Sequence, residues 1–452
     1  MDKRELRATG ALSVVFSVRL FGLFMIYPVF ASYAAGLTGA NPYLIGEALG
    51  IYGLTQGLLQ VPFGLLSDRF GRKRLIAIGL ILFSIGSAVA ALSTSIFGVI
   101  VGRALQGAGA VGSVILALVA DLTREENRTK AMALVGISIG ASFMVALITG
   151  PIVGNLLGGD GMFWLMAALG LLGVLITRFG VPNSLRPQSR RDAEAVPVLI
   201  GAVLRDKELL RLDFGVFALH AMLTASFLVL PGVLHATLDV PVHDQWRIYL
   251  PVLAVSFGAM VPAVIVAEKY RCMKGVFVGA TALLLLSQLA LCLDREHHPW
   301  IVLASLVAFF SGFNVMEALL PSLVTKTAPA AAKGTAMGLF SSLQFLGIFA
   351  GGVIGGWASQ QGGDTGIFSV TAGVGLCWVI MATTMARPAH FTTRLISIAD
   401  DRLNDGEELA TRLRRVAGVA DVVVIAEEKL VYLKVDAKSF DASLAQSLAG
   451  TA

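Results

Sequence analysis

Four ionisable side chains interrupt long apolar stretches of this sequence, where charge is rare. Arg19, Arg103, His220 and Glu317 each lie among apolar neighbours, and Glu47 lies nearer the end of such a stretch. A charged group inside a lipid bilayer costs on the order of several kcal/mol, so it usually faces a partner, a cavity or an ion pathway. These residues predict proton or ion chemistry within a membrane.

The residues around Glu317 predict a pocket. In a helix, Phe310, Phe313, Asn314 and Glu317 share one face, because residues three, four and seven apart lie above one another. That face can line a site for an apolar molecule, and its carboxyl group can gain a proton where water is excluded and lose it beside an arginine. The alternative is a structural carboxylate that accepts a hydrogen bond from an amide.

Each of the other candidates has two interpretations. Arg19 and Arg103 can hold a carboxylate or a substrate anion, or they can be fixed ion-pair partners. His220 titrates near neutral pH, but a single histidine in an apolar stretch also serves packing. The candidates for proton coupling or substrate binding are Arg19, Glu47, Arg103, Gln106, His220 and Glu317, and Gln344 is a further pocket residue.

The elements that carry these residues are long apolar segments. The chain has 452 residues, of which 56% are hydrophobic and 14% charged, and its mean hydropathy of +0.77 excludes an ordinary soluble protein. A helix needs about 20 apolar residues to cross a hydrocarbon core of about 30 Å. Helices of this kind are expected at 11–35, 43–66, 75–94, 97–121, 131–157, 162–181, 212–234, 247–267, 275–293, 300–324, 334–358 and 366–387. They predict an all-α polytopic membrane protein.

Basic residues predict the orientation of these helices. If the N-terminus lies inside, the inner connections hold most Lys and Arg residues of the membrane region, and the outer ones hold only Arg247 and Arg295. Cytoplasmic loops collect Lys and Arg, so both termini are expected in the cytoplasm. The net charge of +5 follows from this asymmetry. It does not indicate a nucleic-acid partner, because the basic residues are spread over separate short loops.

Several other classes of protein are disfavoured. The first apolar stretch is interrupted by Arg19 and is too long for the core of a cleaved signal peptide. Cys272, Cys292 and Cys377 are far apart and form no C-x-x-C pair, so neither a disulfide framework nor a metal site is expected. The chain has no phosphate-binding G-x-x-x-x-G-K-[ST] motif and no catalytic triad pattern. We therefore expect no enzyme activity and no cofactor, and an ion gradient as the energy source.

The sequence divides into two similar halves and a tail. Residues 62–74 align with 262–274 at a uniform offset of 200, and residues 128–132 resemble 333–337. Such repeats predict two pseudo-symmetric bundles around a central site, although short segments also match by chance. We expect a first six-helix half at 1–181, a cytoplasmic linker at 182–211, a second six-helix half at 212–388 and a separate cytoplasmic domain at 389–452.

The tail has the composition of a soluble domain. Strands are expected at 391–399, 422–426 and 430–435, with a tight turn at 427–429. Leu409, Leu413 and Val416 fall on one face of a helix, and a second helix is expected at 439–448. This β-α-β-β-α order predicts a small ferredoxin-like, α+β domain. The tail also resembles heavy-metal-associated domains, but it contains no cysteine, so we expect no metal there.

A charged hinge lies between the second and third apolar stretches. Its sequence GLLSDRFGRKRL (64–75) is similar to the G-x-L-a-D-r-x-G-r-k-x-l loop of the major facilitator superfamily, and RALQGAGA (103–110) resembles the R-x-x-q-G-x-g-a motif of that family. The resemblance implies a charged latch that holds the cytoplasmic side closed in the outward-facing state. The latch residues are Gly64, Asp68, Arg69, Gly71, Arg72, Lys73, Asp121 and Arg128. The alternative is that the basic residues only set topology.

Two further segments narrow the resemblance. Gly150, Pro151 and Gly154 resemble the motif that marks the antiporters of the superfamily. The expected glycines are replaced by Ile137, Ala146 and Asn155. A proline kink without influence on transport direction is the alternative. Residues 314–352, together with the tail, resemble the YajR-type branch of the proton-driven drug-efflux transporters.

The resemblance and the buried charges together imply a function. We expect a proton-coupled efflux antiporter for small, partly apolar molecules, with twelve membrane helices in a bacterial inner membrane. Its partners would be protons, the substrate and the lipid bilayer, without nucleic acid, and the chain would be a monomer. The alternatives are a symporter or uniporter of a small metabolite and a membrane sensor that transports nothing.

Overall fold

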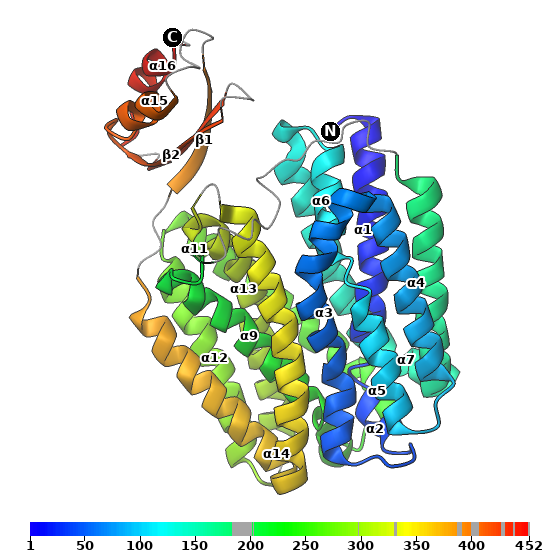
Figure 1. Ribbon diagram of the computed structural model, residues 1–452. Coiled ribbons are helices and arrows are strands. Elements are labelled where there is room, and N and C mark those ends of the chain that lie inside the picture. Colours follow the sequence, from blue (N-terminus) through cyan, green and yellow to red (C-terminus); the bar gives the residue numbers. More distant parts are fainter. Residues whose placement is uncertain are drawn as a thin grey trace.

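The computed structural model describes residues 1–182, 201, 203–296, 298–329, 332–386, 391–398, 406–425, 430–436 and 439–450. Residues 183–200 of the predicted linker, the predicted turn at 427–429 and the boundary at 387–388 lie outside the described residues. Two helical bundles and a small tail domain follow one another along the chain (Figure 1).

The first bundle begins at the N-terminus. Its elements are α1 (Lys3–Met25), α2 (Phe30–Ala34), α3 (Pro42–Phe70), α4 (Arg72–Ala91), α5 (Ile96–Ala108), α6 (Gly112–Leu122), α7 (Glu125–Leu175) and the π-helical turn η1 (Ile176–Gly180). Asn41 caps α3, and its side chain accepts a hydrogen bond from Leu44 N. Gly71, with φ of 90°, separates α3 from α4, because a left-handed backbone favours glycine.

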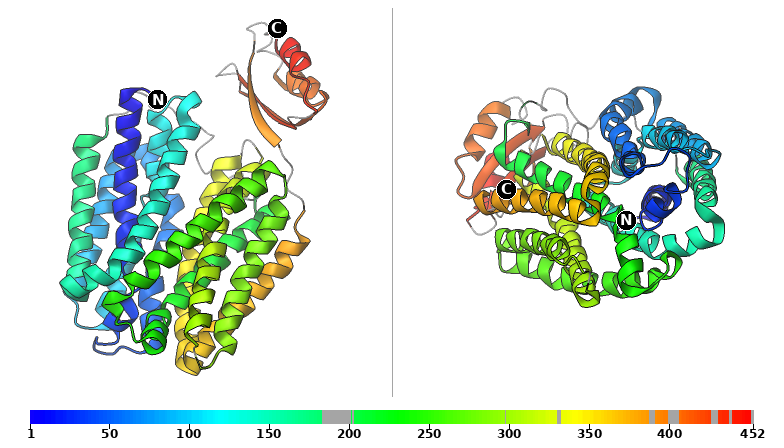
Figure 2. Two further views of the ribbon diagram at one scale, coloured as in Figure 1. Left: turned by 180° about the vertical axis from the view of Figure 1, so that it is seen from behind. Right: turned by 90° about the horizontal axis from the view of Figure 1, so that it is seen from below.

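The second bundle follows the linker. Its elements are α9 (Lys207–Phe227), α10 (Leu230–Leu238), the 3₁₀ turn η2 (Val242–Asp244), α11 (Trp246–Lys269), α12 (Met273–Leu293), α13 (Pro299–Thr327) and α14 (Lys333–Thr384). Figure 2, seen from below, shows the two bundles side by side, the first in blue to cyan and the second in green to orange.

Ten helical segments within the described residues are long and apolar enough to cross a membrane. Two of them, α7 with 51 residues and α14 with 52 residues, would each extend for about 75 Å at about 1.5 Å per residue, more than twice a hydrocarbon core. Each is interrupted by non-helical glycines, Gly158 in α7 and Gly362 and Gly363 in α14. The chain folds back at these glycines, so each supplies two crossings, and the predicted polytopic fold is confirmed.

Three predicted spans differ from the structure because each consists of two helices. Span 11–35 is divided between α1 and α2, span 97–121 between α5 and α6, and span 212–234 between α9 and α10. Proline explains two of the breaks, since it lacks a backbone donor: Pro28 lies between α1 and α2, and Pro231 lies in the first turn of α10. At the third break the backbone of Gly109 packs against Gly79 of α4.

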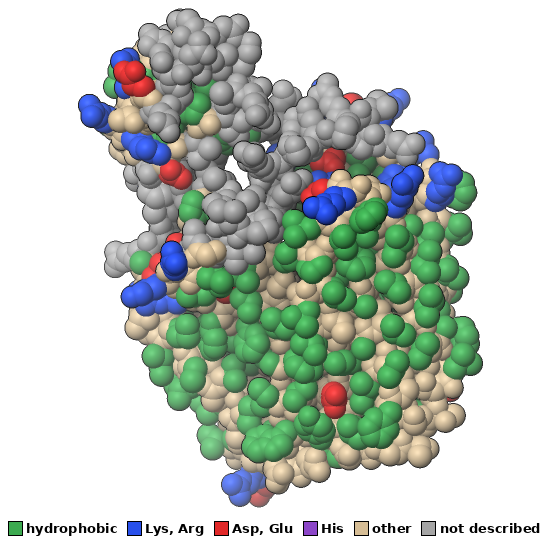
Figure 3. Space-filling view, in the orientation of Figure 1, with side chains coloured by type: hydrophobic (Ala, Val, Ile, Leu, Met, Phe, Trp, Pro, Cys, Tyr) green, Lys and Arg blue, Asp and Glu red, His purple; other side chains and the backbone are tan. Residues whose placement is uncertain are grey.

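Apolar side chains cover the sides of the bundles. Figure 3 shows green side chains interspersed with tan over the sides of the bundles, and most of the visible Lys and Arg at the end that carries the N-terminus. Large apolar residues such as Leu58, Ile137, Leu156 and Phe179 are exposed on the bundles, which is expected of a surface solvated by lipid. We call the end with Met1 and the tail the terminal end and the opposite end the far end.

The bundles pack through a strip of glycines on α3. Hypothetical Cβ atoms on Gly50 and Gly57 would lie 2.8 Å from Phe349 O and 2.9 Å from Ser342 O of α14, so only glycine permits this approach. The strip runs from Gly46 to Gly57, whereas Gly64, nearer the terminal end, faces Ser113 of its own bundle. The ribbons of the two bundles separate toward the terminal end (Figure 1).

The tail forms a three-stranded antiparallel sheet with two helices. Its elements are β1 (Phe391–Ser397), α15 (Gly406–Leu413), β2 (Val419–Ile425), β3 (Leu430–Asp436) and α16 (Ala442–Ala449), and the strand order is β1-β3-β2. Leu409, Leu413 and Val416 pack into its core together with Val431 and Leu433. The predicted β-α-β-β-α order of a small α+β domain is confirmed.

Candidate functional site

Aromatic rings from both bundles meet in the middle of the molecule. Phe143 of α7 stacks on Phe313 of α13 with 5.4 Å between ring centroids. Phe24 of α1 contacts Phe143 at 4.9 Å, and the His220 ring lies 5.8 Å from Phe313. This line of rings crosses from one bundle to the other and provides an apolar surface at the level of Glu317.

Glu317 lies beside His220 and Gln344. Its Oε1 is 3.5 Å from His220 Nε2, and its side chain is 36% exposed although it lies in the middle of α13. Gln344 Nε2 is 2.8 Å from the same nitrogen, and His220 Nδ1 is 3.1 Å from Val216 O. The carbonyl of Val216 requires a hydrogen on Nδ1, so Nε2 of the neutral ring accepts from Gln344.

This geometry provides two neighbouring acceptors for one proton. A proton on Glu317 leaves the His220 ring neutral and bonded to Gln344. A proton on His220 Nε2 instead creates an ion pair with Glu317. The glutamate, histidine and glutamine come from α13, α9 and α14, so the two acceptors lie where three helices of the second bundle come together.

The other residues of the predicted pocket face are more deeply buried. Phe310 is fully buried against Phe227, at 6.3 Å between ring centroids. Asn314 is 4% exposed, and its Nδ2 has no hydrogen-bond partner among the described residues. Phe313 reaches the opposite bundle through Phe143.

Arg103 is bonded to the backbone. Its Nε and Nη2 donate to Ala48 O at 3.3 Å and Leu49 O at 3.1 Å, and its Nη1 donates to Gln106 Oε1 at 3.0 Å. Gln106 Nε2 in turn donates to Ser87 Oγ at 2.7 Å. All three nitrogens of the guanidinium are therefore occupied, and this arginine and its glutamine join α5 to α3 and α4.

The guanidinium of Arg19 makes fewer hydrogen bonds than that of Arg103. Its Nη2 donates to Gln56 Oε1, whose amide donates to Gln60 Oε1 at 3.1 Å. Nε and Nη1 of Arg19 have no hydrogen-bond partner among the described residues. Glu47 is partly exposed in the first half of α3, beside Gly46 of the glycine strip.

Three of the predicted latch residues form a charge cluster at the terminal end. Arg72 Nε lies 2.5 Å from Asp121 Oδ2, and Arg72 Nη1 lies 3.2 Å from Asp68 Oδ1. In the second bundle, Lys326 Nζ lies 2.8 Å from Glu268 Oε1, and Glu268 is the residue that the repeat aligns with Asp68. Each cluster lies within one bundle, and a latch between the bundles remains a prediction.

The other charged latch residues have separate environments. Lys73 Nζ donates to Val181 O at 2.8 Å, and Arg69 is exposed. Arg128 is partly buried, and its Nε has no hydrogen-bond partner in the described part of the chain.

The predicted antiporter motif packs against the break between α1 and α2. A Cβ on Gly150 would lie 3.0 Å from Pro28 Cγ, and one on Gly154 would lie 3.2 Å from Val29 Cγ1. Pro151 and Gly154 line a cavity of about 330 Å³ whose other wall includes His243 of η2. The motif therefore lies where the two bundles meet near the far end.

A second cavity, of about 450 Å³, lies at the far end of the second bundle. Asp294, His298 and Trp300 are among its lining residues. The hydrogen bond between His298 Nδ1 and Asp294 Oδ1, at 2.6 Å, raises the pKa of His298. None of the site residues predicted from the sequence lines this cavity.

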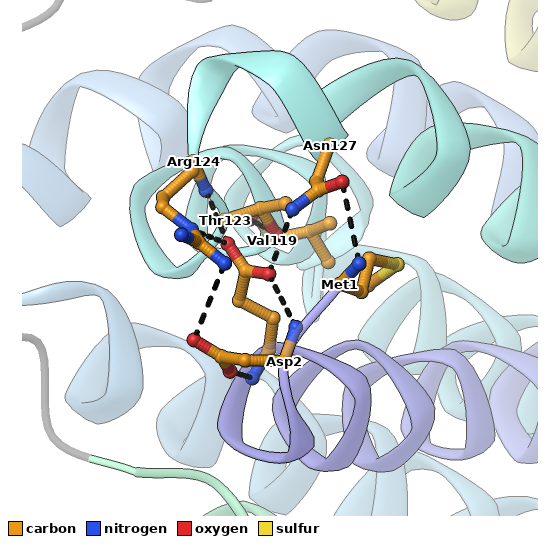
Figure 4. A network of polar contacts seen from close by, with 7 residues as sticks. Met1, Asp2, Val119, Thr123, Arg124 and Asn127 are labelled. Atoms are coloured by element: carbon orange, nitrogen blue, oxygen red, sulfur yellow. Dashed lines mark hydrogen bonds and ion pairs between the residues drawn. The ribbon is translucent and has the colours of Figure 1, made fainter.

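A network around Glu5 was not predicted from the sequence. Glu5 Oε1 accepts from Arg124 N at 2.8 Å and from Arg124 Nε at 3.1 Å, while Oε2 accepts from Asn127 Nδ2 at 2.9 Å and Asp2 N at 2.9 Å (Figure 4). Asp2 and Glu5 form a capping box at the start of α1, and their D-x-x-E spacing was the available signal. The network joins α1 to the connection between α6 and α7.

A buried acid was also missed. Asp213 of α9 is 2% exposed, and its Oδ2 has no hydrogen-bond partner among the described residues. It lies at the start of a predicted span, where a charged residue is common and does not by itself indicate burial. Its burial could be recognised only from packing.

Comparison with known proteins identifies the family. Residues 12–351 match the Major Facilitator Superfamily, and residues 396–441 match the YajR YAM domain. The inner membrane transport protein YajR of Escherichia coli (strain K12) is 43% identical over 438 residues, which cover 97% of this chain and 96% of the relative. The chain belongs to the Major Facilitator Superfamily. Its resemblance to the YajR branch, which residues 314–352 and the tail indicated, is confirmed.

Two other comparisons give more distant matches. The class B tetracycline resistance protein of Escherichia coli is 30% identical over 195 residues, which cover 41% of this chain and 47% of the relative. A solved bacterial homologue of the human lysosomal transporter Spinster, in an inward-facing and occupied conformation, shares the fold with a TM-score of 0.71 and 13% identity, over 86% of this chain and 98% of that chain. The chain is therefore a membrane transporter, and its family implies a small-molecule substrate.

Proposed function

We propose that this protein is an inner-membrane, proton-coupled efflux antiporter for small, partly apolar molecules. The observation that carries the proposal is the shared proton site: Glu317 and Gln344 both approach His220 Nε2, and Glu317 remains partly exposed in the middle of the membrane region. A proton at this position neutralises a charge that is costly inside a bilayer, so its arrival and departure change the stability of the surrounding helix contacts.

Alternating access supplies the transport cycle. The bundles are joined by the glycine strip near the far end, and the ribbons separate toward the terminal end. If the terminal end is cytoplasmic, as the basic residues favour, this arrangement corresponds to an inward-facing state. Substrate would enter between the bundles against Phe143 and Phe313, and protonation of Glu317 from the outer side would precede the return to this state.

The antiporter motif supports the proposed direction of coupling. Gly150 and Gly154 let α7 pack closely on the break between α1 and α2, at the end where the bundles now meet. Close packing there keeps the far end shut while substrate binds from the terminal end. Without such closure, protons could cross together with the substrate or in its absence.

The test uses Glu317→Gln in proteoliposomes that contain a trapped pH-sensitive dye. Compounds are first selected by their ability to raise the melting temperature of the parent protein, since a bound ligand stabilises the folded state. With such a compound and an imposed proton gradient, the parent should exchange protons for substrate. Glu317→Gln should retain the thermal shift and lose the proton movement.

The matched control is Glu296→Gln, because the Glu296 side chain is 85% exposed at the far end. It should behave as the parent. Proton movement in the same direction as substrate would favour a symporter, and substrate movement without protons would favour a uniporter. Compound-dependent proton flux through Glu317→Gln equal to that of the parent would show that another group couples transport.

A further inference from the structure

Two arginines are buried in the membrane region of the first bundle, and their hydrogen bonding differs. Arg103 is 0% exposed and each of its guanidinium nitrogens donates to an oxygen of the protein. Arg19 is 1% exposed, yet only Nη2 has an acceptor among the described residues, Gln56 Oε1. Arginine has five N–H donors and no acceptor, so the Nε and Nη1 donors of Arg19 are left without a partner in the described part of the chain.

Within the described part of the chain, Arg19 has too few hydrogen-bond acceptors and no carboxylate partner. The centroid of the Tyr52 ring lies 5.8 Å from Arg19 Cζ and 5.1 Å from Arg103 Cζ, so the ring is close to both cations. Tyr52 is 0% exposed and its hydroxyl also has no hydrogen-bond partner among the described residues. Among those residues neither guanidinium forms an ion pair with a carboxylate. Two buried positive charges therefore lie close to the same aromatic ring.

Buried cations in proteins are paired with an anion or bonded to oxygen atoms. Arg103 meets this requirement through backbone carbonyls, but Arg19 does not. We propose that Arg19, with the hydroxyl of Tyr52, binds a small monovalent anion inside the first bundle. The chemistry is that of a charge-assisted hydrogen bond to a compact anion, which chloride and the carboxylate group of an organic acid both satisfy.

The burial of the site limits the size of the ligand. The centroid of the Phe83 ring lies 6.0 Å from Arg19 Cζ, and the Gln56 side chain, which accepts from Arg19, is bonded to Gln60. Arg19, Tyr52 and Gln56 each expose 1% of their surface or less. The proposal does not depend on Glu317 as the coupling group, because the anion site lies within the first bundle and the proton site within the second.

The experiment measures thermal stability of the purified full chain in detergent, in a sodium HEPES buffer without small anions. Sodium chloride, bromide, formate or acetate is then added at constant ionic strength, with sodium HEPES as the balance. The parent should show a saturable rise in melting temperature with at least one of these anions. Arg19→Gln should reduce the apparent affinity roughly tenfold or more, because it removes a charged donor.

Arg247→Gln is the matched control for the loss of one arginine, since Arg247 is 66% exposed beside Asp244 at the far end. It should leave the anion effect unchanged. Tyr52→Phe removes only the hydroxyl and should weaken the effect by a smaller factor. If Arg19→Gln does not fold, this variant and bromide anomalous scattering from crystals of the parent still locate the anion.

The choice of anion distinguishes a bound inorganic ion from the carboxylate group of a substrate. Stabilisation by chloride and bromide alone identifies a resident inorganic ion, and stabilisation by formate or acetate without chloride identifies the carboxylate of a substrate; both outcomes support the site. Equal stabilisation of the parent and Arg19→Gln, or none in the parent at constant ionic strength, overturns the proposal and leaves water as the partner of Arg19.

Discussion

At the scale of single residues, each bundle carries an ion pair near its terminal end, with the charges in opposite order along the chain. In the first bundle a basic residue, Arg72, pairs with Asp121 at the end of α6. In the second, an acidic residue, Glu268, pairs with Lys326 near the end of α13. The first pair is the more buried, with side chains 12% and 17% exposed, against 26% for Lys326 and 53% for Glu268.

This difference predicts unequal contributions to stability. Asp121→Asn should lower the free energy of unfolding by about 1–3 kcal/mol, because it leaves Arg72 with weaker partners in a mostly buried site. Glu268→Gln should lower it by only about 0–1 kcal/mol, since solvent screens the exposed pair. Denaturant unfolding of both variants in detergent compares the two values. Equal losses would show that burial of the first pair has no energetic consequence.

For the ionisable residues in the apolar stretches, the sequence identified the chemical type of each side chain, but it did not identify the residues with which each one interacts. Glu317 and His220 were recognised separately as charges in apolar stretches, but only the fold brings them within 3.5 Å of each other. Arg19 and Arg103 had the same two interpretations in the sequence, and only their neighbours distinguish a guanidinium bonded to backbone carbonyls from one that lacks acceptors among the described residues. Hydropathy indicates which segments are buried. The residue that each charged side chain contacts depends instead on how helices distant in the sequence pack together.

At the scale of helices, the glycine strip of α3 determines how closely the bundles approach. Gly46, Gly50, Gly53 and Gly57 recur at helical spacing on one face, which is a signal that the sequence contains. On α14 the facing residues include Gly352, so backbone lies against backbone. Close contacts of this kind replace the hydrophobic effect as the source of helix association in lipid.

Gly50→Val should therefore destabilise the arrangement seen here. Its side chain would meet Phe349 O, at 2.8 Å from the Cβ position, and would force α3 and α14 apart near the far end. Distances between spin labels at the far ends of the two bundles should increase. Gly279→Val is the matched control, because nothing lies within 4 Å of the Cβ position there, and it should leave the distances unchanged. Unchanged distances in Gly50→Val would mean that the strip does not hold the bundles together.

Helix positions were largely predictable, and helix ends were not. The twelve apolar stretches account for the membrane crossings, because length and hydropathy are properties of a local segment. The breaks within three spans were missed, although Pro28 and Pro231 were visible in the sequence. In a membrane a proline interrupts a helix only where neighbouring helices satisfy the freed backbone groups, and that condition depends on the whole fold.

At the scale of the whole molecule, the tail follows the second bundle and consists of a sheet and two helices of its own. It has its own apolar core, which includes Ile396, Leu413, Val431 and Leu433. From residue 389 to the end it contains eight basic and ten acidic residues, and it lies at the terminal end, where the bundles carry their basic residues (Figures 1 and 3). Opposite charges of this kind attract weakly and are screened by salt.

We therefore expect the tail to modulate transport without being required for it. Deletion of everything after Arg387 should leave a folded transporter whose rate differs from that of the full chain at low ionic strength and matches it at high ionic strength. The reason is that exposed ion pairs contribute only about 0–1 kcal/mol each and weaken as salt is added. The measurement is substrate flux in proteoliposomes at two salt concentrations, with circular dichroism as the control for folding. Complete loss of flux in a well-folded truncation would make the tail obligatory, and an unchanged salt dependence would show that its charge has no influence on the bundles.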